Sequence, residues 1–165
     1  VLTGGLDTVV NFMGFVMVYL AENPDFGHIL AKDSSLISNA VMELLRRFPV
    51  VADAREVKHD LEYGGVTMKK GDMVLAPTVL HGLDDEQYDH PLDVRLGRPM
   101  PRHTSFGKGV HICPGQFLAR LEMRVMIEEW LRLIPDFRIE PGTEIRYSGG
   151  IVQTVQPFRL EWDVD

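Results

Sequence analysis

The chain has 165 residues, of which 45% are hydrophobic and 25% are charged, a composition typical of one compact globular domain and unlike that of a disordered or fibrous chain. Seventeen Lys and Arg against 24 Asp and Glu give a net charge of −7, which repels polyanions and argues against a nucleic-acid partner. The single cysteine, Cys113, cannot form an internal disulfide, so we expect a cytoplasmic protein in which any special role of this residue is as a thiol or thiolate.

The start of the chain predicts a long apolar helix over Leu2 to Ala21 that ends near Asn23-Pro24, with most of its faces buried. The residues that recur at steps of three and four are Leu6, Val9, Val10, Met13, Val16, Met17 and Leu20. The apolar run from Val9 to Ala21 is shorter than the about 20 residues that span a membrane, which favours a core helix and no membrane contact. Because no initiator Met or leader precedes this pattern, we expect the back part of a longer protein.

Two shorter helices and a small sheet are expected next. One helix follows Pro24, and another runs from about Ser35 to Phe48, with a cap at Asp33, Ser34 or Ser35 and a stop before Pro49. Short β-prone segments between Arg55 and Ala76 predict one small antiparallel sheet. These segments and their turns are Leu61–Tyr63, Gly64-Gly65, Val66–Met68, Lys69–Asp72 and Met73–Leu75.

A long loop, a helix and a strand-rich tail complete the chain. Residues 81–112 are rich in Gly, Pro, Asp and His, which indicates an ordered functional loop. A helix is expected from Gly115 to Leu133, and strands and turns from Phe137 to Trp162. The outward side chains of this helix, Gly115 to Leu133, are expected to be Arg120, Glu122, Arg124, Glu128 and Glu129. The fold class predicted is therefore mainly α with a minor antiparallel β-sheet, as a single unit over residues 1–165.

The only thiol lies in the segment Phe106-Gly107-Lys108-Gly109-Val110-His111-Ile112-Cys113-Pro114-Gly115, directly before the long helix. Free amides and the helix dipole at a helix N-terminus stabilise a thiolate. Gly107 and Gly109 permit turns that a side chain would forbid, and Gly115 allows close approach of another body. A free cysteine is more often a small core residue, so these residues alone leave both interpretations open.

The spacing of this segment resembles the haem-thiolate signature of the cytochrome P-450 family: Phe, two residues, Gly, three residues, Cys, one residue, Gly. Phe106, Gly109, Cys113 and Gly115 match it, and a chance match is on the order of a few in ten thousand. The likeness extends over essentially the whole chain and is strongest to soluble bacterial camphor-hydroxylating members. It is carried by Gly4-Gly5-Leu6-Asp7-Thr8, Leu44-Leu45-Arg46-Arg47-Phe48, Leu118-Ala119-Arg120 and Ile134-Pro135-Asp136-Phe137.

The resemblance implies the C-terminal half of the cytochrome P-450 fold, with Cys113 as the axial ligand of haem b. A thiolate donates more electron density to iron than imidazole and favours cleavage of the O–O bond. Phe106 would exclude water beside the sulfur, and Pro114 has no N–H to offer it. Arg55 and His111 would bind the haem propionates, although either could instead be a surface residue.

Two polar pairs have roles in the family. Glu43 and Arg46 resemble its Glu-x-x-Arg motif, which ties its helix to the loop before the Cys helix; Glu129 and Arg132 match the motif equally but lie on another helix. Such a pair is ordinarily a solvated contact.

Asp7 and Thr8 resemble the acid and alcohol that relay protons to dioxygen. Thr8 can bond the carbonyl of Gly4, and an acid in an apolar helix is expected to be paired or used, because burial of a carboxylate is costly.

The substrate pocket is expected at Gly4, Val51, Ile151 and Val152, although apolar residues at strand ends are more often plain core. The resemblance implies a monooxygenase that hydroxylates a small hydrophobic, terpenoid compound with dioxygen. Electrons would come from reduced nicotinamide through a reductase and a [2Fe-2S] ferredoxin, which Lys108 and Arg102 could attract. Two alternatives remain open: a peroxygenase or isomerase without an external electron donor, and a non-catalytic module with an inert buried cysteine.

Overall fold

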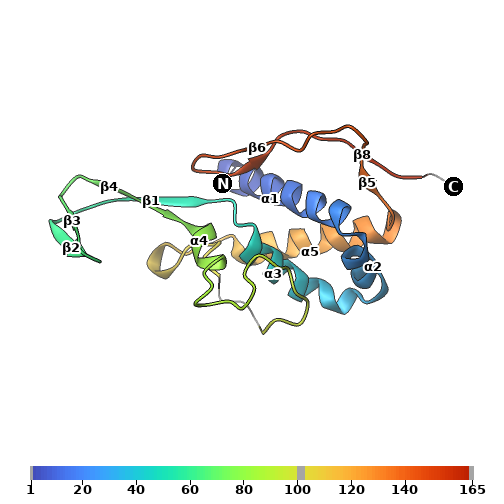
Figure 1. The fold of residues 1–165 in the computed structure, drawn as a ribbon, viewed down its shortest axis with the longest axis horizontal. Helices are drawn as coiled ribbons and strands as arrows, with labels where there is room; N and C mark the ends of the chain where they lie inside the picture. Colours follow the sequence, from blue (N-terminus) through green and yellow to red (C-terminus); the bar gives the residue numbers. More distant parts are fainter. Residues whose placement is uncertain (1, 100–102, 164–165) are drawn as a thin grey trace.

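The computed structural model describes residues 2–99 and 103–163. Four helices form its centre: α1 (Leu2–Glu22), α2 (Pro24–Lys32), α3 (Ile37–Arg47) and α5 (Gln116–Leu133). Helix α5 packs against the other three (Figure 1). The predicted class, mainly helical with minor antiparallel β-structure, is confirmed.

The core lies where the apolar stripes of these helices meet. Its fully or almost fully buried members include Phe12, Val16, Leu20, Leu30, Ile37, Ala40, Val41, Leu44, Met123, Ile127 and Leu131. Helix α1 is long and apolar enough to cross a membrane by length and composition, and one of its faces, with Phe12, Val16 and Leu20, is part of this core. The expectation that most of α1 is buried is wrong for the opposite face, where Leu6 and Val10 are 61% and 63% exposed, because none of the described residues covers that side.

Prolines and a capping side chain determine the ends of helices α1, α2 and α3. Helix α1 ends at Glu22, and Pro24 occupies the first turn of α2, where a missing N–H costs nothing. The carboxylate of Asp33 accepts hydrogen bonds from the backbone N–H of Ser35 at 3.0 Å and from its hydroxyl at 2.6 Å. This cap begins a 3-10 turn, η1 (Ser34–Leu36), and α3 follows and ends before Pro49. The predictions of these helices are confirmed.

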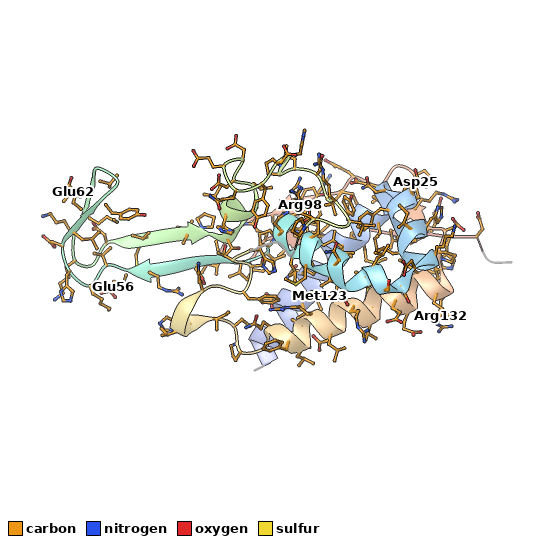
Figure 2. All side chains as sticks on the ribbon, turned by 90° about the horizontal axis from the view of Figure 1, so that it is seen from below. Asp25, Glu56, Glu62, Arg98, Met123 and Arg132 are labelled. Atoms are coloured by element: carbon orange, nitrogen blue, oxygen red, sulfur yellow. The ribbon has the colours of Figure 1, made fainter. Side chains whose placement is uncertain are left out.

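The predicted single sheet is wrong, because the structure has two separate pairs here. Strand β1 (Ala52–Glu56) pairs with β4 (Met73–Pro77), and β2 (Leu61–Tyr63) pairs with β3 (Val66–Met68). The turn at residues 69–72 connects β3 to β4 along the chain but does not pair the two strands. It bonds instead to Val57, just after β1, whose N–H donates to the carbonyl of Asp72 at 2.9 Å. Figure 2 shows both pairs reaching away from the helices, with Glu56 and Glu62 near their far end.

A short helix, α4 (Thr78–Gly82), was not predicted, and it precedes a long loop in which residues 83–99 and 103–108 form neither helix nor strand. A 3-10 turn, η2 (Gly109–His111), follows within the Cys segment. In the tail, β5 (Arg138–Ile139) pairs with β8 (Leu160–Glu161), and β6 (Tyr147–Ser148) pairs with β7 (Thr154–Val155). Strands β5 and β7 lie against α1, so the tail, drawn in red in Figure 1, covers one side of that helix.

Candidate functional site

A cavity of about 300 Å³ lies between the start of α1, the segment before β1, the Cys segment and the start of α5. Its lining is mostly apolar. The lining residues that the sequence had singled out are Gly4, Thr8, Val51, Phe106, His111, Cys113 and Gly115. Thr8 and Cys113, which are far apart in the sequence, therefore face one space.

The Cys segment is held in a tight loop by its own backbone. The N–H of Cys113 donates to the carbonyl of Phe106 at 2.9 Å, and the N–H of Gly107 donates to that of Thr104 at 2.7 Å. Gly107 and Gly109 have φ angles of 71° and 73°, in the left-handed region that favours glycine. Gly109 helps to shape the loop but does not line the cavity. Cys113 is half-buried, just before the first turn of α5.

On α1, the hydroxyl of Thr8 donates to the carbonyl of Gly4 at 2.8 Å, which confirms the expected bond. Asp7 is exposed and lies outside the cavity lining, so the premise that its carboxylate needs relief from burial is wrong in this structure. Asn11 donates to the backbone carbonyl of Asp7 at 2.8 Å and to its Oδ1 at 3.3 Å. The sequence reasoning missed Asn11, although its position one turn after Asp7 was the available signal.

The two proposed propionate contacts are placed differently. His111 lines the cavity, whereas Arg55 does not. The guanidinium of Arg55 donates to the carbonyl of Ala54 at 2.8 Å and lies 3.7 Å from the carboxylate of Asp53. Asp53, which the sequence reasoning missed, does line the cavity. Because Asp53 and Arg55 are two apart on β1, strand alternation puts both on one side, and this spacing was the available signal.

The two apolar segments expected at the substrate adjoin each other. Val51 forms a bridge with Val152, and the N–H of Ala52 donates to the carbonyl of Ile151 at 2.8 Å. Only Val51 of these residues lines the cavity. Ile151 is 70% exposed, so the structure brings the segments together without placing Ile151 or Val152 in the lining.

Glu43 and Arg46 form a completely buried ion pair. Burial alone would raise the pKa of Glu43, but hydrogen bonds from the Arg46 side chain, the Arg95 N–H and the Arg98 side chain outweigh it, and the pKa is lowered. Arg46 also donates to the carbonyls of Gly82, Pro91 and Asp93. Figure 2 shows Arg98 beside α3, so the pair and its neighbours anchor the long loop to this helix.

The second match to the same motif behaves as an ordinary surface pair. Arg132 donates to Glu129 at 2.7 Å, but the two side chains are 61% and 54% exposed. The sequence spacing is identical, and only burial distinguishes the two pairs.

Arg120 does not point outward as predicted. Its guanidinium carbon lies 5.3 Å from the ring centres of both Phe106 and Phe117, and the side chain is half-buried. Nearby, burial and the charge of Arg120 lower the pKa of His103 to about 4. Of the two predicted partner-binding cations, Lys108 is exposed on the Cys segment, and Arg102 lies outside the described residues.

Comparison with known proteins agrees with this geometry. The model of the family described as Cytochrome P450 matches residues 1–161. The probable cytochrome P450 127A1 of Sinorhizobium fredii is 38% identical over 161 residues, which are 98% of this chain and 39% of the relative. The crystal structure of CYP101J2 is similar with a TM-score of 0.93 and 53% identity, over 99% of this chain and 41% of that chain. CYP101C1 gives a TM-score of 0.94 and 40% identity, over 99% and 42%. The chain thus spans about two fifths of the proteins it matches.

Proposed function

The chain belongs to the cytochrome P450 family, whose members hold haem b through a cysteine thiolate, and on this premise we propose that it is the C-terminal part of a haem-thiolate monooxygenase. The supporting observation is that Thr8 and Cys113 line one largely apolar cavity. The residues fit the group: a thiol at the cavity wall, a histidine to bind propionate, and apolar side chains for the porphyrin face. When bound, haem supplies the activation of dioxygen.

Cys113 would hold the iron. Its own N–H is engaged with the carbonyl of Phe106, and Pro114 has no N–H, so the sulfur has fewer nearby donors than an ordinary residue would give it. Fewer hydrogen bonds leave more electron density on a thiolate. Phe106 lines the cavity beside Cys113 and would keep water from the sulfur.

Asp7 and Thr8 would move protons into the cavity. The exposed carboxylate of Asp7 can exchange protons with solvent, and the neighbouring Thr8 reaches the cavity. The hydroxyl of Thr8 donates to Gly4, so it must rotate away from that carbonyl to donate into the cavity. Gly4 and Gly5 leave open space beside the helix, since no atom of the described residues outside the helix's own backbone lies within 4 Å of where their Cβ atoms would be.

The proposed substrate is a small hydrophobic compound, of the terpenoid, camphor-like class. The apolar lining around Val51 supports it, as does the similarity to CYP101 structures. Electrons would come from a [2Fe-2S] ferredoxin and its reductase in the cytoplasm, with exposed Lys108 offering a positive charge next to the Cys segment. Reversal of this charge in the full-length protein is expected to slow reduction and weaken its salt dependence.

The test is a carbon monoxide difference spectrum of the reduced full-length protein. A thiolate-type Soret band is expected, and Cys113→Ser is expected to abolish it. Thr8→Ala should keep the band but form less product per dioxygen consumed. Absence of the band, or of stoichiometric haem uptake, would overturn the proposal. Turnover with peroxide but not with ferredoxin and dioxygen would identify a peroxygenase instead.

A further inference from the structure

Arg120 occupies a defined place behind the Cys segment. Its guanidinium is 5.3 Å from the ring centres of Phe106 and of Phe117, within the range of cation–π attraction. It also donates a hydrogen bond to the side chain of Gln116, one turn earlier on α5. Contacts from three directions therefore fix the guanidinium of a side chain that is otherwise long and flexible.

Phe106 connects this guanidinium to the thiol. Its carbonyl accepts the N–H of Cys113 at 2.9 Å, and Phe106 lines both the cavity that Cys113 lines and a second cavity that Arg120 lines. Phe106 also lies 5.9 Å, ring centre to ring centre, from His103. A shift of its ring would therefore reach Cys113 through the loop backbone.

The charge of Arg120 is not neutralised locally. Within residues 2–99 and 103–163, no carboxylate forms an ion pair with Arg120, and its buried Nε has no hydrogen-bond partner. A partly desolvated charge acts more strongly and over a longer range than one in water. His103 is coupled to Arg120, which helps to lower the pKa of this histidine to about 4. It is therefore neutral near pH 7 and does not add to the positive charge.

We propose that Arg120 is a positioning residue for the thiolate: it holds Phe106 against the Cys113 loop and places a positive charge, paired with no carboxylate of the described residues, beside Phe106. This inference rests on the proposed function. A positive charge favours the more negative, reduced state of the iron–thiolate unit, so Arg120 should raise the reduction potential of the haem.

The test compares Arg120→Met, Arg120→Lys and Arg124→Met in the full-length holoenzyme. Arg124 is an exposed arginine one turn further along α5, so it controls for loss of charge alone. Reduction potential and the Soret spectrum are measured at pH 7. The potential is expected to fall in Arg120→Met, to return toward wild type in Arg120→Lys, and to stay unchanged in Arg124→Met.

Equal potentials in Arg120→Met and wild type, or equal shifts in Arg120→Met and Arg124→Met, would overturn the inference. Should Arg120→Met not fold, Arg120→Lys decides, because lysine keeps the charge and loses the planar stacking. A changed Soret band in Arg120→Lys supports positioning, and a Soret band identical to wild type refutes it. A wild-type protein without a thiolate-type band would refute the proposed function itself, so the two failures are distinguishable.

Discussion

Removal of the Arg46 guanidinium should cost a large part of the stability of the protein. Arg46→Met would leave Glu43 buried with Arg98 as its remaining side-chain partner, and would deprive three backbone carbonyls of their donor. Breaking a buried ion pair costs about 3–5 kcal/mol, and each carbonyl that loses its donor adds roughly 1 kcal/mol. Because Arg98 compensates in part, we expect a loss of at least about 4 kcal/mol, against total stabilities of about 5–15 kcal/mol.

The chain supplies its own control. Arg132→Met removes the same group from the same spacing, but the Glu129–Arg132 pair is exposed, and exposed pairs contribute about 0.2–1 kcal/mol. Urea unfolding of both variants of the full-length protein, followed by fluorescence and by haem absorbance, measures the difference. Comparable midpoints for Arg46→Met and Arg132→Met would refute the argument that burial gives the Glu43–Arg46 pair its role.

Three further outcomes are expected. The pKa of His103 in the folded protein, about 4, lies below its ordinary value of 6.5. As the pH drops from 6.5 to 4, the unfolded chain therefore takes up the proton first, and the free energy of unfolding should fall by at most about 3 kcal/mol. His103→Gln should reduce this loss in urea titrations, and a pH profile identical to wild type would contradict the prediction. Gly82→Ala should destabilise strongly, because its Cβ would overlap the carbonyl oxygen of Arg46. A Cβ at Gly5 would meet no atom of the described residues within 4 Å beyond its own helix backbone, so similar melting temperatures for Gly82→Ala and Gly5→Ala would contradict this. Residues 1–165 alone should bind more of an apolar dye than the full-length protein does, because Leu6 and its neighbours on α1 are exposed. Equal dye binding, or full activity of residues 1–165 alone, would contradict this prediction.

Sequence patterns predicted the elements whose determinants are local. The 3.6-residue apolar period predicted α1, and proline and capping side chains predicted the boundaries around α2 and α3. Strand pairing depends on contacts between distant segments, so the pattern located β2, β3 and β4 but not the return of β4 to β1. Helix α4 is too short to show a period, and its Gly82 is determined by a contact with Arg46.

Within the candidate site, the sequence did not predict which charged side chains are buried or what surrounds them. Arg120 and Arg124 are one turn apart and were both expected outward, yet only Arg124 is exposed. The difference arises because Phe106 approaches α5 from a loop whose path depends on Gly107 and Gly109 and on the anchoring of that loop to α3. An arginine beside an aromatic ring from another segment has no signature in helical periodicity. Glu43–Arg46 and Glu129–Arg132 look alike in sequence but differ in burial for the same reason. Burial depends on which other segments pack against a helix, and the sequence of the helix alone does not show them.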